Sequence, residues 1–424
     1  MIAKTHAHLQ TCCADNHQQW MAAQAAFQQG EVRQAAGAFW VYTPGADGEV
    51  TVAFPQLDAD QASEQIDAIL AYCYARRPLR QVGCWSLLPT QPPDLGVRLL
   101  ARGFEWGWQP HWMWLDFTQM HTNHPVPDGL QVALVTEETL WQALDLPYDS
   151  PAMLAFLRAS SQTSPRRLWH FGAWLDGALV GQSVLFATGG EQAAAGIYNC
   201  GVTPAARNRG VGKAVVLAAC QQAQALGYAG ALLNATPLGE PVYRRLGFQS
   251  IGHGQTWWLH RAALDASPPS AQAIALVEAV GRGDLAHLDR MAATVTPTVL
   301  DTPLHNGMML LEVAALLQQP AAAEWLLKHG ATLDVLTART LGWRERIPAL
   351  LAAHPALANR RTGPHGTTPL HIAAWENDLE LIAQLLAAGA DVTVQDHSFH
   401  ATPAGWARHN GHPAAAQLIE QARP

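Results

Sequence analysis

Apolar residues in the middle of the chain fall into three short runs that are separated by turn residues. The first run spans residues 168–175 and the second spans residues 178–186, and only Asp176 and Gly177 lie between them. Both of these residues tolerate a positive φ, so an Asp-Gly pair between two apolar runs predicts a tight β-hairpin. Another glycine-containing turn precedes the third run, residues 194–202. The pattern predicts an antiparallel meander of three strands.

Beyond the third run the apolar spacing changes to that of a helix. Apolar residues recur every three or four positions from Val211 to Ala218, which predicts an amphipathic helix that begins at Gly210 and ends before Gly227. A strand, a short helix and a closing strand are predicted next, at residues 229–235, 240–246 and 256–260. A meander followed by a β-α-β unit, a helix and a last strand describes a mixed α/β (α+β) domain.

The last third of the chain follows a different pattern, that of a repeat. Residues 366–374 read GTTPLHIAA, and Thr402 repeats Thr368 at a spacing of 34 residues. A shift of 59 residues also places Gly307 on Gly366. These residues resemble the opening of the ankyrin repeat, T-P-L-H-x-A. The resemblance implies an all-α solenoid of four or five stacked helix pairs, each of which buries its apolar face only against its neighbours.

Two linkers rich in proline and polar residues divide the chain. They lie at residues 121–129 and 266–271. A chain of 424 residues is too long for one hydrophobic core, so two or three domains are expected. We therefore expect a first domain at 1–122, a middle domain at 126–262 and the repeats at 270–424.

Composition narrows the function classes. The net charge is −8 and no run of Lys or Arg occurs, which disfavours a nucleic-acid partner and suits a cationic substrate. No apolar run reaches 18 residues and the N-terminus lacks a signal peptide, so neither a membrane span nor a membrane partner is expected. Six cysteines without a C-x-x-C pair indicate buried reduced thiols. His121 and His124 lie in a linker, so we expect no metal. These features together predict a cytoplasmic protein.

The strongest chemical signal lies between the third strand and the helix that follows it. Residues 202–213 read VTPAARNRGVGK. Free amides at a helix N-terminus bind phosphate, and Gly210 and Gly212 let the backbone approach the anion closely. A P-loop would need glycine where Arg207 stands, and a dinucleotide-binding loop would need a small residue where Val215 stands. What remains is the pattern R-x-x-G-x-G, preceded by V-x-P.

This pattern resembles the loop of the GNAT superfamily of N-acetyltransferases. In that family the loop binds the pyrophosphate of acetyl-CoA, and the preceding strand pairs with the pantetheine arm. Residues 234–248 resemble the family's later CoA-contacting segment, which carries Asn, Tyr and Gly-Phe. The resemblance implies acetyl-CoA as acyl donor and a set of CoA-contacting residues, namely Cys200, Val202, Arg207, Asn208, Arg209, Gly210, Val211, Gly212, Lys213, Asn234 and Tyr243.

Tyr243 is our candidate catalytic acid. A neutral amine attacks the thioester carbonyl, and a backbone amide of residues 200–202 is expected to stabilise the oxyanion. The departing thiolate then needs a proton. A CoA thiol should have a pKa of about 8.5 and a tyrosine one of about 10, so the phenol can donate a proton at modest cost. Packing of Tyr243 beside Phe248 is the alternative interpretation.

The base that removes a proton from the amine stays open. Glu191 precedes the third strand, and Asp145 and Asp149 lie in a probable substrate loop. Tyr198 and Asn199 stand where some family members place a glutamate. A base acting through water, or no base at all, is therefore an alternative to these carboxylates.

The first segment resembles a second, degenerate copy of the same fold. Gly103 and Phe104 repeat Gly247 and Phe248 at an offset of 144 residues, and the same offset puts Leu99 in the place of the candidate acid. The segment contains no R-x-x-G-x-G motif. We expect that it cannot hold CoA in the family's way, so that each chain has a single active site.

Alternating tryptophans mark the end of this first segment. Trp106, Trp108, Trp112 and Trp114 predict one strand with aromatic rings on one face. Two interpretations stay open. The rings pack in the core or between domains, or some of them line a pocket for an amine, because ring faces attract cations.

Three functions remain. The first is an acyl-CoA N-acetyltransferase that acts on a primary amine of a small molecule, such as a polyamine or an aminoglycoside-like antibiotic, which would be a resistance function. The second is a protein acetyltransferase whose ankyrin repeats recruit the target or mediate self-association. The third is a non-catalytic interaction protein, which the intact glycine loop and Tyr243 disfavour.

Overall fold

The structure is a computed structural model of the chain that describes residues 5–45, 48–77, 79–136, 144–146, 148–362 and 365–422. The chain divides into two compact units. The first contains Met1–Leu99 and Phe104–Ser267, and the second contains Leu100–Gly103 and Pro268–Pro424. The first unit is built on a mixed α/β sheet and the second is helical. This arrangement confirms the predicted fold class.

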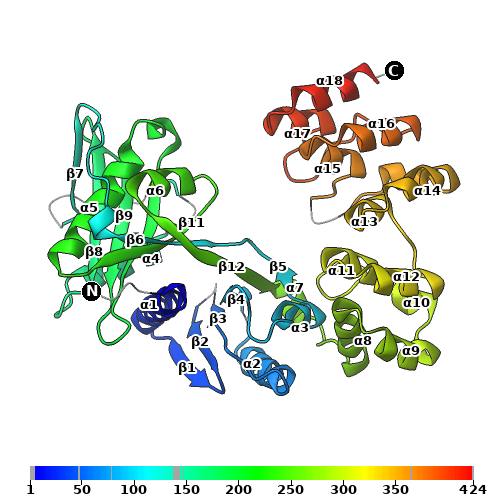
Figure 1. Cartoon of the computed structure of the whole chain (residues 1–424), viewed down its shortest axis with the longest axis horizontal. Helices are drawn as coiled ribbons and strands as arrows, with labels where there is room; N and C mark the ends of the chain where they lie inside the picture. Colours follow the sequence, from blue (N-terminus) through cyan, green and yellow to red (C-terminus); the bar gives the residue numbers. More distant parts are fainter. Residues whose placement is uncertain are drawn as a thin grey trace. The chain divides into compact units, whose positions relative to one another are not determined.

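Twelve strands in the described part of the first unit form one mixed sheet (Figure 1). The order across the sheet is β1-β2-β3-β4-β12-β6-β11-β10-β9-β8-β7, and β5 pairs with β12 off this path. In chain order the strands are β1 Glu31–Ala35, β2 Ala38–Thr43, β3 Glu49–Ala53, β4 Gln81–Leu87, β5 Glu105–Trp106, β6 His111–Asp116, β7 Leu130–Leu134, β8 Leu168–Leu175, β9 Ala178–Ala187, β10 Ala195–Val202, β11 Gly230–Ala235 and β12 Gln249–His260.

Helices cover the faces of this sheet. Helix α5 packs on β8, β9 and β10, and α1 packs on strands from both halves of the sheet, including β2 and β10. The helices and 3-10 turns of the first unit are α1 His6–Phe27, α2 Ala62–Tyr74, α3 Leu95–Ala101, η1 Phe117–Gln119, α4 Pro151–Ser161, η3 Pro204–Ala206, α5 Val211–Ala225, α6 Glu240–Leu246 and α7 Arg261–Asp265. The sequence pattern did not predict α1.

Local turn chemistry explains the elements that the sequence did predict. Asp176 and Gly177 join β8 and β9 with φ angles of 52° and 83°, as the predicted hairpin requires. Gly247 ends α6 in the left-handed region, with a φ of 102°. Phe248 follows it and is buried. These signals act within a few residues of the chain, so a single sequence reveals them.

Two predicted strands differ from the structure. The closing strand begins at Gln249 rather than residue 256, because the chain continues the pairing through Gly252 despite a register shift there. The tryptophan-rich stretch forms two short strands, β5 and β6, rather than one. Between them Pro110, which has no amide hydrogen to donate, interrupts the ladder. Trp112 and Trp114 still pack on one face, whereas Trp106 and Trp108 are partly exposed.

The first and middle segments exchange strands. Strand β6 of the first segment lies between β11 and β12, pairing with β11 from Gly230↔Asp116 to Ala235↔His111. The second half of β12 in turn pairs with β4, from Gly254↔Leu87 to His260↔Gln81. Figure 1 shows β12 reaching from one half of the sheet to the other. The division of the unit into domains at 1–122 and 126–262 stays a prediction, and in the structure the two segments share one sheet.

The second unit consists of successive helix pairs. Its helices and 3-10 turns are α8 Ala271–Arg282, α9 Leu285–Met291, η4 Ala292–Thr294, α10 Pro297–Leu300, α11 Leu310–Leu316, α12 Pro320–Lys328, α13 Val335–Thr340, η5 Arg344–Arg346, α14 Ile347–Ala353, η6 Pro355–Asn359, α15 Pro369–Trp375, α16 Leu379–Ala387, α17 Pro403–His409 and α18 Pro413–Gln421. The histidine of the T-P-L-H motif, His371, connects two successive repeats through its ring nitrogens. His371 accepts a hydrogen bond from the Thr368 amide at 3.2 Å and contacts the Ala401 carbonyl at 3.1 Å, which ties one repeat to the next.

Candidate active site

Strands β10 and β11 form a wedge, and this wedge is the centre of the candidate site. They run parallel but pair only at Ala195↔Ala231 and Gly196↔Leu232 in the described residues. Beyond Gly196, β10 keeps its pairing with β9, which shifts register between Tyr198 and Gly201. Such a shift marks a β-bulge, which bends the strand away from its neighbour. The side of β10 that faces β11 therefore has backbone groups that an extended ligand can pair with.

The glycine loop lies at the open end of this wedge. Gly210 is the N-cap of α5 and has a φ of 85°, a conformation that glycine adopts without strain. The side chains of Arg207, Asn208 and Arg209 are exposed, whereas Val211 is 1% exposed and anchors the helix in the core. The first amides of a helix have no partner within the helix. The loop thus combines free amides, the positive end of the helix dipole and two arginines, which suits a pyrophosphate.

Gly212, Arg207 and Lys213 are three of the predicted CoA-contacting residues, and they lie in or next to this loop. Gly212 lies beside Val202, since a Cβ atom at position 212 would be in ordinary van der Waals contact with Val202 Cγ2 at 3.5 Å. The Arg207 guanidinium donates a hydrogen bond to the Val202 carbonyl at 3.3 Å. Lys213 is half-buried on the first turn of α5. The structure therefore brings the residues predicted between Val202 and Lys213 together at one helix start.

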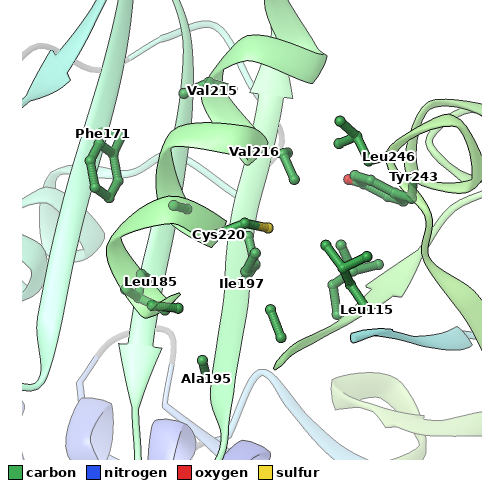
Figure 2. Close-up of a cluster of buried hydrophobic side chains, with 14 of the residues drawn as sticks. Leu115, Phe171, Leu185, Ala195, Ile197, Val215, Val216, Cys220, Tyr243 and Leu246 are labelled. Carbon is green, nitrogen blue, oxygen red and sulfur yellow. The ribbon is translucent and has the colours of Figure 1, made fainter. Parts of the chain in front are cut away.

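Tyr243 reaches the same wedge from α6. Its ring is 8% exposed and belongs to the core under α5. Figure 2 shows its phenolic oxygen pointing toward the side of α5 that carries Val216 and Cys220. Burial raises the pKa of the Tyr243 hydroxyl, and the neighbouring Cys200 side chain, to which it is hydrogen-bonded, raises it further. The hydroxyl is therefore protonated near neutral pH, and its donation of a proton costs more than it would for an exposed tyrosine.

Cys200 and Asn234 lie on the two strands that border the wedge. Burial raises the pKa of the Cys200 thiol to about 12, so the thiol is neutral and not a nucleophile. Asn234 is half-buried on β11, opposite Trp112 of β6. Both positions fit residues that contact an extended ligand lying between the strands.

The three candidate bases differ in their surroundings. Asp149 is half-buried, and its two carboxylate oxygens accept hydrogen bonds from Gln182 Nε2 at 2.7 Å and from the Leu144 amide at 3.0 Å. Burial raises the pKa of this carboxyl despite these donors. Asp145 and Glu191 are exposed. Glu191 also precedes the start of β10, at the end of the strand remote from the glycine loop.

Gln182 connects Asp149 to a buried histidine. Because its amide nitrogen donates to Asp149, its oxygen faces His170 Nε2 at 3.1 Å and accepts a hydrogen bond from it. Burial lowers the pKa of His170 from 6.5 to about 4, so the ring is neutral. The sequence analysis missed both Gln182 and His170, because nothing in an apolar strand indicates which polar side chain will meet a distant loop.

Helix α1 of the first segment covers β10 at its bulge. The Tyr198 hydroxyl donates to Asn16 Oδ1 at 2.6 Å, and its ring stacks on Trp20 at a centroid distance of 4.5 Å. His17, next to Asn16, contacts the rings of Tyr198 and Trp112 at 5.5 and 5.4 Å. The Tyr198 side chain therefore packs against α1, so it does not serve as the base that a glutamate at this position supplies in some family members.

The parallel strands of the first segment show no comparable wedge in the residues that the structure describes. Its parallel pair, β3 with β4, keeps five consecutive residue pairs from Glu49↔Gln81 to Ala53↔Trp85. Leu99, at the position that corresponds to Tyr243, is 4% exposed and belongs to an apolar core. That this segment cannot hold CoA stays a prediction.

Other expectations concern thiols, metals and membranes. No disulfide joins the cysteines of the described residues, and five of the six are buried. In the described ranges, no group of three or more His, Cys, Asp or Glu side chains is arranged to hold a metal ion. The described helices include none that is both long and apolar enough to cross a membrane.

Comparisons with known proteins agree with the site. The model of the acetyltransferase (GNAT) family matches residues 132–248, and the ankyrin repeat model matches residues 365–397. No curated protein matches the chain.

Solved structures of low sequence identity resemble the chain. A GCN5-related N-acetyltransferase from Kribbella flavida is 15% identical with a TM-score of 0.41, and the match covers 57% of this chain and 94% of that one. A tandem GNAT protein from the clavulanic acid biosynthesis pathway is 16% identical with a TM-score of 0.41, over 58% and 94% of the two chains.

The two family matches fall on the two kinds of structure described above. Residues 132–248 contain the wedge, the glycine loop and Tyr243, and residues 365–397 contain α15 and α16. The resemblances that the sequence motifs suggested are thereby confirmed. Residues 132–248 thus carry an acetyltransferase (GNAT) domain, and residues 365–397 carry an ankyrin repeat.

Proposed function

We propose that the chain transfers an acetyl group from acetyl-CoA to a primary amine of a small molecule. The observation that carries this proposal is the wedge, where β10 and β11 part after Gly196 and open toward the exposed helix start at Gly210. A pantetheine arm carries amide groups along an extended chain, so it can pair with β10 as an added strand does. The pyrophosphate would then meet the amides of residues 210–213, with Arg207 and Arg209 beside it.

In this proposal the chain's own residues divide the work of acyl transfer. A neutral amine attacks the thioester carbonyl, and a backbone amide of residues 200–202 stabilises the oxyanion. The carbon–sulfur bond then breaks, and the thiolate takes a proton from Tyr243. Asp149 is the best-placed of the candidate bases, because it is half-buried and two donors fix its orientation. Tyr243 later regains a proton from solvent.

Release of free thiol from acetyl-CoA tests the reaction. The full chain would be offered polyamines, aminoglycosides, monoamines and lysine peptides, while calorimetry measures CoA binding separately. We expect CoA to bind and at least one amine class to release thiol. A chain that neither binds CoA nor releases thiol with any amine would overturn the proposal.

Tyr243→Phe tests the acid. This variant removes only the hydroxyl, so we expect kcat to fall at least tenfold while the Kd for CoA stays unchanged. Tyr228→Phe is the matched control, because the Tyr228 hydroxyl donates to the Thr188 carbonyl and belongs to no part of the wedge. An unchanged rate for Tyr243→Phe would refute the assignment.

Protein acetylation is the second candidate, and the ankyrin unit favours it. Phe399 is 68% exposed in a loop that Asp396 fixes by accepting hydrogen bonds from the amides of Ser398, Phe399 and Ala401. A rigid loop that presents an exposed aromatic ring is typical of a protein-binding surface. A chain that lacks residues 268–424 would then lose activity on proteins but keep activity on free amines. We place either reaction in the cytoplasm, where buried cysteines stay reduced.

A further inference from the structure

Tyr148 contacts β10 where the strand leaves β11. A Cβ atom at position 201 would lie 1.9 Å from the Tyr148 hydroxyl oxygen and 2.6 Å from Leu146 Cδ1. Only glycine therefore lets this loop close on the strand. The same loop holds Asp149, whose carboxylate is bonded to Gln182. Gly201 is thus the place where the loop meets the wedge.

Tyr148 and Tyr243 approach the wedge from opposite faces of the sheet. Gly201 pairs with Gln182 on β9, and paired residues share a face. The next residue, Ser183, points to the other face, where its hydroxyl donates to the Val215 carbonyl of α5. Tyr148 therefore lies on the face away from α5, whereas Tyr243 packs in the core under α5. The Cys200 side chain is near enough to both tyrosines to raise the pKa of each hydroxyl.

Two buried polar atoms at this bend have no partner within the described residues. They are the Tyr148 hydroxyl and Asn199 Nδ2. Asn199 also has a positive φ of 47°, which is uncommon for a residue other than glycine. Folded proteins satisfy most buried polar groups, so two such atoms at one bulge indicate a place that a ligand completes.

The protonation state of Tyr148 restricts what it can do. Burial raises the pKa of its hydroxyl well above the usual value, and the neighbouring Cys200 and Asp149 raise it further. The phenol is therefore neutral throughout the working pH range. A neutral phenol that lacks an acceptor within the protein is a hydrogen-bond donor rather than a base.

We propose that the Tyr148 hydroxyl donates a hydrogen bond to the acyl carbonyl oxygen of the bound thioester, which makes it a second oxyanion donor and a catalytic residue. This inference rests on the proposed acetyl transfer. As the amine nitrogen bonds to the carbonyl carbon, the π electrons move to the oxygen, and Tyr148 and a backbone amide of residues 200–202 stabilise that charge. The amine loses its proton to Asp149. Collapse then breaks the carbon–sulfur bond, and the thiolate takes the proton of Tyr243.

Tyr148→Phe separates this role from a structural one. The variant removes a hydroxyl that makes no hydrogen bond to the described residues, so the midpoint of urea unfolding should stay equal or rise. We expect kcat to fall about 100-fold, the typical cost of losing one oxyanion donor, while the Kd for CoA stays unchanged. Tyr228→Phe is the control, because it removes a phenol that is bonded to Thr188 at 2.8 Å. It should lower stability and leave kcat unchanged.

A binding measurement keeps the test independent of the acceptor. S-acetonyl-CoA carries a carbonyl group that cannot be transferred, so the ratio of its Kd to that of CoA reports on the carbonyl contact alone. Tyr148→Phe should weaken binding of S-acetonyl-CoA several-fold and leave CoA binding as it was. If both the ratio and kcat match those of the wild type, Tyr148 has no such role although the acetyltransferase stands. If the wild type binds no CoA, the proposed function is wrong, and the inference about Tyr148 is wrong as well because it rests on that function.

Discussion

Removing the first segment should unfold the acetyltransferase segment, because the two share strands. A fragment of residues 126–262 lacks β6, which lies between β11 and β12. Three side chains of β6 are at most 1% exposed, namely Trp112, Met113 and Leu115. Each buried side chain of this size stabilises the fold by about 1.5–3 kcal/mol, so the fragment loses about 5–9 kcal/mol of burial. A domain has only about 5–15 kcal/mol of net stability.

Hydrogen-bond pairing adds to this loss. Strand β6 pairs with β11 along its whole length and with the first part of β12, and the second part of β12 loses β4 as well. Far-UV circular dichroism in urea and CoA calorimetry on residues 1–267 and 126–262 measure the effect. We expect the longer fragment to unfold cooperatively and to bind CoA. The shorter one should show no cooperative transition, and addition of residues 1–122 should restore binding.

One outcome would refute this reasoning. The end of β12, from Gly254 to His260, now pairs with β4, but in the short fragment it could fold back into the place of β6. The fragment 126–262 would then unfold at the same urea concentration as 1–267 and would bind CoA equally well. The strand exchange would in that case be a choice between two arrangements of similar stability rather than a requirement of the fold.

Two further predictions concern the glycine loop and the buried histidine. Gly210→Val forces a branched side chain into a φ of 85°, a strain of about 1–2 kcal/mol that the free loop relieves by leaving this conformation. CoA binding must then restore the strained loop, so CoA should bind about tenfold more weakly by calorimetry, and an unchanged Kd would contradict the role of the loop. Burial lowers the pKa of His17 from 6.5 to about 3, so the unfolded chain binds more protons between these values and stability falls as the pH drops through them. At pH 4 this effect lowers the free energy of unfolding by about 3 kcal/mol. In the His17→Phe variant the urea midpoint should therefore fall less between pH 7 and pH 4 than in the wild type. An equal fall in both proteins would contradict the role of His17.

The sequence predicted what local chemistry decides. Asp176 and Gly177 need positive φ, Gly247 ends a helix, and residues 202–213 combine glycine and arginine at a helix start, so each could be identified without a structure. Local sequence does not predict which strand pairs with which. Apolar alternation tells which face of β6 or β12 is buried, but it does not tell whether the neighbour comes from the same segment.

Contacts between distant residues account for what the sequence analysis missed. Tyr148 lies in a loop whose composition indicated only a substrate loop with two carboxylates. The available signal was Gly201, since a glycine inside an apolar strand often marks a bulge or a close approach. Asn16 gave no signal either, although its side chain is fully buried and bonds to Ala194 and Tyr198. Its partners are more than 170 residues away along the chain.

The two parallel strand pairs, β3 with β4 and β10 with β11, differ in a way that gives the first segment a structural role, although it lacks the R-x-x-G-x-G motif. In the first segment β3 and β4 are paired along five consecutive residues, and the described part of this pair has no register shift. In the middle segment β10 and β11 part after two pairs, which leaves backbone groups of the sheet without strand partners.

An open wedge weakens a sheet, so the strands that border it need support from elsewhere. The first segment gives this support, because β6 completes the ladder on the far side of β11 and α1 covers β10 at its bulge through Asn16 and Trp20. The half of the sheet in which β3 and β4 stay paired therefore stabilises the half in which β10 and β11 part.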